Sequence, residues 1–247
     1  MRTLIRLVKA LSAVGVAGLL TLSLGACGDS KDDAEETPES AQSVVQEEEV
    51  EIEEEPAGAE MSPGEFALMM VNAARGDEEP LTEYADNVHV RNVVTENQEA
   101  METALEMMLD APPTAEEIDA LNAAISDAIA RTQVELVEEE VDGDQGRAVV
   151  SILGINHEEG TDLASSDPEV QALVFEDMDK MMYLIAVKGW ELSPLMEEPY
   201  EIEFNYKMNS ETGKWEPADT DEVKKQTMIA PALLGETSTL EYIEENL

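Results

Sequence analysis

The side chains that could carry chemistry are few in this sequence, and they are loosely grouped. Of the two histidines, only His157 lies among carboxylates, in the run Asn156-His157-Glu158-Glu159. A histidine in that setting could ligate a metal ion or act as a general base, with an exposed loop histidine as the alternative. Asp142-Gly143-Asp144 has the spacing that opens a calcium loop, but the later ligands are missing, so a hairpin turn is the alternative. Asp142, Asp144 and His157 are therefore weak metal candidates.

Motifs that would assign an enzymatic reaction are absent from the sequence. It contains no G-x-S-x-G, P-loop, H-E-x-x-H or C-x-x-C pattern. Carboxylates are so numerous that choosing two as an acid–base pair would be arbitrary. We therefore expect a protein that is not an enzyme, has no catalytic residue and uses no cofactor. A hydrolase is the least supported alternative.

The single cysteine, Cys27, closes a short hydrophobic run near the N-terminus. Three basic residues precede the run, and residues 10–22 carry no charge. A membrane-spanning helix needs about 20 apolar residues, so this run is too short and has instead the pattern of a signal peptide. It ends in the sequence Leu24-Gly25-Ala26-Cys27.

That sequence resembles the lipobox of bacterial lipoproteins. In this family the cysteine receives a diacylglyceryl group, and the chain is cut just before it. The resemblance implies that residues 1–26 are a lipoprotein signal peptide and that Cys27 is the lipidation site. It places the mature chain on the extracytoplasmic face of the cell membrane, held by two acyl chains, which suffice for stable anchoring. A plain signal peptide followed by an incidental cysteine is the alternative.

The chain is strongly acidic, with 57 Asp and Glu residues against 14 Lys and Arg and a formal net charge of −43. Nucleic acids and anionic lipid surfaces both select clusters of Lys and Arg. We therefore expect no nucleic-acid partner, and membrane contact only through the lipid on Cys27. The acid excess favours adaptation to a saline or alkaline habitat, because salt screens self-repulsion. Collection of divalent cations is the competing hypothesis.

The stretch after the cysteine is expected to be a tether. Residues 29–60 hold 14 acids, one lysine and no aromatic residue. Such a segment cannot bury enough apolar surface to offset the entropy of ordering it. We therefore interpret residues 27–61 as the lipidated cysteine and a disordered acidic tether, with a docking tail for a basic partner as the alternative.

Helix-start signals and hydrophobic periodicity organise the next part of the chain. Capping signatures at residues 62–65, 95–98 and 114–117 predict three helices. Residues 156–166 have the composition of a polar loop. Asp167-Pro168 predicts the start of the longest helix, which continues to Lys188 with Gly189 as its stop.

Two β-hairpins are predicted from alternating patterns. The first turns at Asp142-Gly143-Asp144. The second begins with the strand Tyr200–Met208 and returns through Lys214-Trp215-Glu216. A last helix should begin at Asp219 or Thr220 and end at Pro231.

Together these elements predict an α+β fold in which two hairpins form one antiparallel sheet packed by helices. The N-terminal helices and the hairpin around Gly213-Lys214-Trp215 look like those of Gram-positive lipoproteins with a cystatin-like or NTF2-like domain of unknown function. That resemblance implies a curved sheet wrapped by helices, often with a pocket. We expect residues 62–235 to be a single domain and residues 236–247 a loosely held acidic tail.

The function these observations favour is a membrane-anchored extracytoplasmic lipoprotein that acts as a non-enzymatic binding or interaction module. Its partner could be an envelope protein, a peptide or a small ligand. A calcium-binding protein of the envelope is the main alternative, and an envelope hydrolase is the weaker one.

Overall fold

The computed structural model describes residues 61–78, 81 and 90–247. Cys27, the lipobox, the acidic tether and His89 lie outside the described residues. The first described helix, α2 (Pro63–Ala74), begins with the predicted capping box, in which Ser62 and Glu65 each accept the other's backbone N–H. Gly76 follows the helix with a φ of 108°, as expected of a glycine that ends a helix.

Four strands form one antiparallel sheet in the order β1-β2-β3-β4. This arrangement confirms the predicted α+β class and the joining of the two hairpins. A bulge between Leu136 and Glu138 interrupts the pairing of the first two strands. The strands are β1 (Gln133–Asp142), β2 (Gln145–Leu153), β3 (Tyr200–Asn209) and β4 (Lys214–Pro217).

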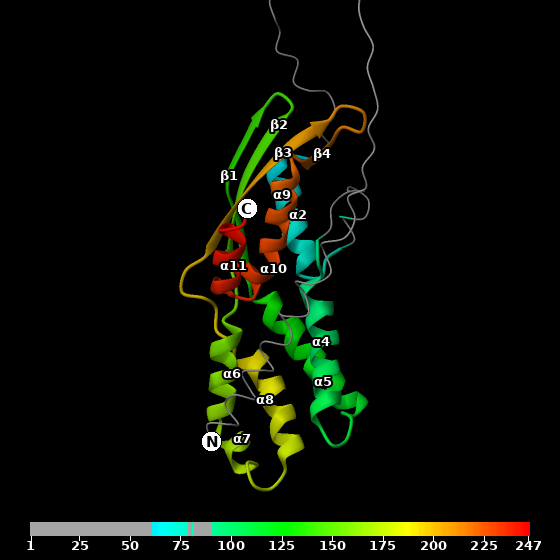
Figure 1. Cartoon of the computed structure of the whole chain (residues 1–247), viewed down its shortest axis with the longest axis vertical. Helices are drawn as coiled ribbons and strands as arrows, with labels where there is room; N and C mark the ends of the chain where they lie inside the picture. The colour runs from blue at the N-terminus through cyan, green and yellow to red at the C-terminus, as the bar shows by residue number, and fades with distance from the viewer. Residues whose placement is uncertain (1–60, 79–80, 82–89) are drawn as a thin grey trace, which may run out of the picture.

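The sheet has one buried and one wet face. On β3, Ile202, Phe204 and Tyr206 are buried, whereas Glu201 and Glu203 on the same strand are exposed. This is the alternation expected of an antiparallel sheet with one solvated face. Figure 1 shows the sheet at one end of an elongated molecule, with α2 and the C-terminal helices beside it.

Helices alone form the other end of the molecule (Figure 1). Arg131 ties two of them together, because its guanidinium donates to the backbone carbonyls of Trp190, Glu191 and Ser193. The helices here are α4 (Val93–Met108), α5 (Ala115–Ala130), α6 (His157–Ser166), α7 (Pro168–Ala172) and α8 (Met178–Leu192).

Four predictions for this end are wrong. The second helix begins at Val93, because the Asn92 side chain accepts the N–H of Thr95 and so caps the helix earlier than predicted. Residues 156–166 are not a loop, because Asn156 caps α6 in the same way. The predicted helix 168–188 is split, because Asp177 accepts the N–H of Lys180 and starts a new helix. That second part continues through Gly189, which does not stop it.

The C-terminal region is helical beyond the expected limit. Pro231 lies inside a helix instead of ending one, and Asp219 is the N-cap of the first helix in this region. The structure also differs from the expected loose tail, because α11 covers most of residues 236–247 and buries Leu240. The elements are α9 (Thr220–Lys225), a short 3₁₀ turn (Gln226–Met228), α10 (Ile229–Leu233) and α11 (Thr237–Glu244).

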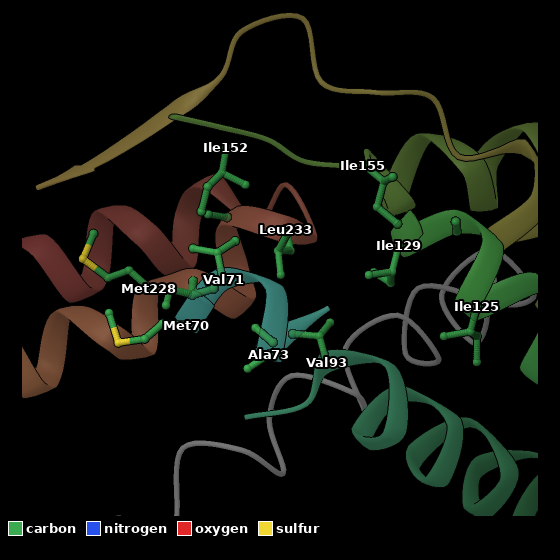
Figure 2. Packing of buried hydrophobic residues seen from close by; sticks show 14 of the residues in the cluster. Met70, Val71, Ala73, Val93, Ile125, Ile129, Ile152, Ile155, Met228 and Leu233 are labelled. Atoms are coloured by element: carbon green, nitrogen blue, oxygen red, sulfur yellow. The ribbon is translucent and has the colours of Figure 1, made fainter. Parts of the chain in front are cut away.

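One hydrophobic core joins the two ends of the molecule. In Figure 2, Ile152 on β2, Val71 on α2 and Leu233 on α10 point toward one another, and all three are nearly inaccessible. Ile155 and Ile129 continue this core toward the helical end. Since the core includes side chains from both ends, the sheet and the helices are held in one arrangement.

Candidate functional site

The two candidate aspartates lie at the tip of the β1–β2 hairpin. Gly143 takes a φ of 61° in the turn between them. The backbone carbonyl of Asp144 accepts the N–H of Met208 (2.7 Å), and its carboxylate lies 3.9 Å from the Lys207 ammonium. These contacts are those of a hairpin turn that is bonded to the neighbouring strand β3.

His157 lies at the other end of β2 from these aspartates, in the first turn of α6. Its ring stacks on the Trp190 ring, with centroids 3.9 Å apart and planes inclined by 21°. Burial lowers the pKa of His157 from 6.5 to about 4, so the ring is neutral at physiological pH. The expected loop histidine is therefore part of the contact between α6 and α8.

The Ser193 hydroxyl is the hydrogen-bond partner of this histidine, with 3.3 Å between Oγ and Nδ1. The hydroxyl itself donates to the carbonyl of Gly189 at 2.6 Å. Because a serine has one proton to donate, Nδ1 of His157 acts as the donor to Oγ. A serine nucleophile needs the opposite polarity, with histidine accepting the proton. The pair therefore links two helices.

No metal site is evident in the part of the chain that the structure describes. Within residues 61–78, 81 and 90–247, no group of three or more His, Cys, Asp or Glu side chains could hold a metal ion. Asp142 and Asp144 are separated from His157 by the length of β2, so the fold does not bring the three candidates together.

A cavity of about 470 Å³ opens beside the ends of β2 and β3 that lie nearest the helices. Its volume falls within the roughly 300–1,000 Å³ typical of small-molecule sites. The walls come from the end of β2, the start of α6, the segment before β3, and α10 and α11. The apolar lining includes Ile152, Leu195, Met196 and Leu240, and the polar lining includes Glu159, Glu197 and Glu198.

Backbone hydrogen bonds hold three distant segments together around this cavity. The N–H of Ile155 donates to the carbonyl of Leu233 at 2.9 Å, and that of Met196 donates to Gly154 at 2.9 Å. Asn156 also donates its N–H to Pro194 at 2.7 Å. Because main-chain bonds fix these walls, the cavity is formed before any ligand arrives.

Two glycines allow the segments to approach this closely. A Cβ at Gly154 would lie 2.1 Å from the carbonyl oxygen of Ala232, closer than any real contact. Gly235 has a φ of 66°, and a Cβ there would lie 2.4 Å from the carbonyl oxygen of Ile155. Both positions therefore need glycine, one for space and the other also for its left-handed backbone.

The polar part of the cavity is negative. Asn156 donates its side-chain amide to the Glu159 carboxylate at 3.1 Å and so orients it. Glu197 and Glu198 are exposed on the segment before β3, and no Lys or Arg is among the residues that line the cavity. Tyr200 adds an aromatic ring, and its hydroxyl donates to the Glu244 carboxylate.

A second surface feature lies at the tip of the helical end. Phe175, in the connection between α7 and α8, is 99% exposed, and Met107 and Met178 are also exposed. The backbone N–H of Asp110 donates to the Asp179 carboxylate at 3.0 Å, so the α4–α5 connection lies beside the start of α8.

Sequence reasoning located the hairpin turn and the histidine, but it did not find the cavity. Its apolar walls look like ordinary core positions, and its carboxylates are indistinguishable from the many others. The detectable signals were Gly154 directly after a buried strand and Gly235 after an apolar helix. Each glycine marks a close backbone approach, yet neither indicates which segment approaches.

The fold and cavity define an α+β protein with an open antiparallel sheet and a lateral cavity. No protein-family model and no curated protein matches the chain in sequence. Among solved structures, the chain is similar to ycdA of Bacillus subtilis, a protein assigned as a lipoprotein, with 11% identity and a TM-score of 0.38. The match covers 56% of this chain and 44% of ycdA, less than half of that protein's length. Similarity at this level supports no conclusion about function.

None of the helices in the described part of the chain is both long and apolar enough to span a bilayer.

Proposed function

We propose that this chain is a lipid-anchored extracytoplasmic lipoprotein whose domain is a non-enzymatic binding module. The observation that carries the proposal is the preformed cavity of about 470 Å³, whose lining combines apolar and polar side chains. Apolar walls with a few fixed polar groups are the usual construction of a small-ligand site. The ligand is a small molecule or one side chain of a peptide, and the cystatin-like or NTF2-like relationship belongs to the same proposal.

The anchor half of the proposal rests on the sequence Leu24-Gly25-Ala26-Cys27. Cys27→Ser removes the thiol that would carry the lipid, so the protein should move from the membrane fraction to the soluble fraction. Ser30→Ala is the matched control and should leave the protein in the membrane fraction. Membrane partitioning of the Cys27→Ser protein equal to that of the natural chain would contradict the lipid anchor.

The binding half can be tested with 1-octanol, a small probe with an apolar body and no charge. The experiment uses the exported chain carrying Cys27→Ser and follows backbone amide shifts by NMR. Saturable shifts should appear at Gly154, Met196 and Leu240, which line the cavity from three segments. A protein that shows no saturable shift with octanol or its charged analogues would contradict a binding module.

A pair of tryptophan substitutions separates binding in the cavity from binding elsewhere. Thr237 is exposed and lines the cavity, whereas its neighbour Ser238 is exposed and does not. Thr237→Trp should obstruct the cavity and weaken octanol binding at least tenfold, whereas Ser238→Trp should leave it unchanged. Equal effects of the two substitutions would place the binding site outside the cavity.

A further inference from the structure

We infer that the cavity selects molecules that combine an apolar body with a positively charged group. This inference rests on the proposed function, since it names the ligand class of the same cavity. It follows from the distribution of charge around the cavity and from the way nearby backbone donors are already used.

The apolar part of such a ligand would meet four aliphatic side chains. Ile152 and Leu240 are buried in the wall, and Leu195 and Met196 are half-buried beside them. Burying an apolar group against these side chains is favourable in proportion to the area removed from water. The flexible methionine can adjust to the shape of different alkyl groups.

The charged part of the ligand would meet carboxylates that have little competition from protein cations. Glu159, Glu197 and Glu198 all line the cavity, and the lining residues include no Lys or Arg. Glu159 is held in place by the Asn156 amide. The Tyr200 ring offers a further surface that favours a cation over an anion.

Helix N-termini near the cavity could favour an anion instead, so their donors matter. In the first turn of α6, the N–H of Glu159 already donates to the Asn156 side chain at 3.0 Å. At the start of α11, Thr237 donates its N–H to Gly235, and Thr239 and Leu240 donate theirs to Glu236. Since these donors are taken, they are not available to hydrogen-bond an anion in the cavity.

The test compares three probes that share an eight-carbon chain: octylammonium, 1-octanol and octanoate. Titrations of the Cys27→Ser chain are followed by NMR at neutral pH and constant ionic strength. We expect octylammonium to bind about tenfold more tightly than octanol, and octanoate to bind most weakly. If octanol binds as tightly as octylammonium, the cavity is a binding site but the ligand class is wrong. If no probe binds, the proposed function fails as well.

Charge-neutral substitutions distinguish the cavity carboxylates from the general acidity of the chain. Glu197→Gln and Glu198→Gln should each weaken octylammonium binding about fivefold and leave octanol binding unchanged. Glu135→Gln and Glu211→Gln change the net charge equally at exposed positions outside the cavity, and they should have no such effect. If all four variants weaken octylammonium binding alike, long-range attraction by the whole molecule explains it and the inference is overturned. Preferential binding of octanoate would overturn it too.

Discussion

His157 makes folding stability depend on pH in a defined direction. Its pKa is about 4 in the folded protein and 6.5 when unperturbed, because burial beside Trp190 reduces the contact of the ring with water. Between these values the unfolded chain binds a proton that the folded chain does not. The contribution of His157 to the free energy of unfolding should therefore be constant above pH 6.5. It should fall by about 2–3 kcal/mol as the pH drops toward 4.

The measurement is urea unfolding of the natural sequence and of His157→Gln between pH 7.5 and 4.5. Carboxylates shared by both proteins titrate in both, so the difference between the two free energies isolates His157. This difference should be largest at pH 7.5 and should shrink as the pH falls. A difference that stays constant over the range would mean that the ring is solvated, as expected from sequence alone.

Sequence reasoning at the residue scale failed where a partner is distant along the chain. Asn156-His157-Glu158-Glu159 is so polar that it favours an exposed position. Trp190 and Ser193, which cover the ring, are more than 30 residues away and carry no pattern that connects them to it. The Asp142-Gly143-Asp144 turn, by contrast, was readable because its determinants are adjacent in the sequence.

At the scale of elements, α6 and α8 pack through glycine. A Cβ at Gly160 would lie 2.3 Å from the carbonyl oxygen of Gly189, whereas a Cβ at Gly189 would meet nothing closer than 3.3 Å. Gly160→Ala should therefore destabilise the protein by about 1–3 kcal/mol through overpacking. Gly189→Ala should be nearly neutral, since a gain in helix propensity of about 1 kcal/mol offsets its tighter contact.

The pair of variants is informative because both glycines lie inside helices, so substitution by alanine raises the helix propensity equally at the two positions. Thermal unfolding of the two proteins under identical conditions gives the comparison. A similar loss of stability in both would mean that α6 and α8 do not approach through Gly160.

The elements themselves were largely predictable, because their determinants are local. Capping boxes at Ser62 and Thr114 and the alternation along β3 gave the correct helix starts and the correct buried face. The division between α7 and α8 was not predictable in this way. Apolar residues continue through Leu173-Val174-Phe175, and only the structure shows that the Phe175 side chain is exposed.

At the scale of the whole molecule, the net charge of −43 should make stability depend on salt. The Debye length falls from about 10 Å at 0.1 M to about 3 Å at 1 M, so added NaCl should relieve self-repulsion and raise the melting temperature. CaCl₂ at equal ionic strength should have a similar effect if the acids act only through the net charge.

Thermal unfolding of the Cys27→Ser chain in the two salts provides the measurement. A melting temperature that does not respond to NaCl would contradict the hypothesis of a saline habitat. A melting temperature that rises in micromolar calcium, but not in NaCl of the same ionic strength, would favour the calcium-binding alternative. Asp142→Asn and Asp144→Asn would then be the next variants.

The attachment of α2 to the sheet has a mechanical consequence for the anchor proposed above. The carbonyl of Met61 accepts the Trp215 indole N–H at 2.9 Å, and the N–H of Gly64 donates to the Glu139 carboxylate at 3.1 Å. A force applied to the chain before Met61 would therefore be distributed over both β1 and β4. The cavity lies toward the opposite end of β2, away from this line of force, so tension on the anchor would leave its walls undisturbed.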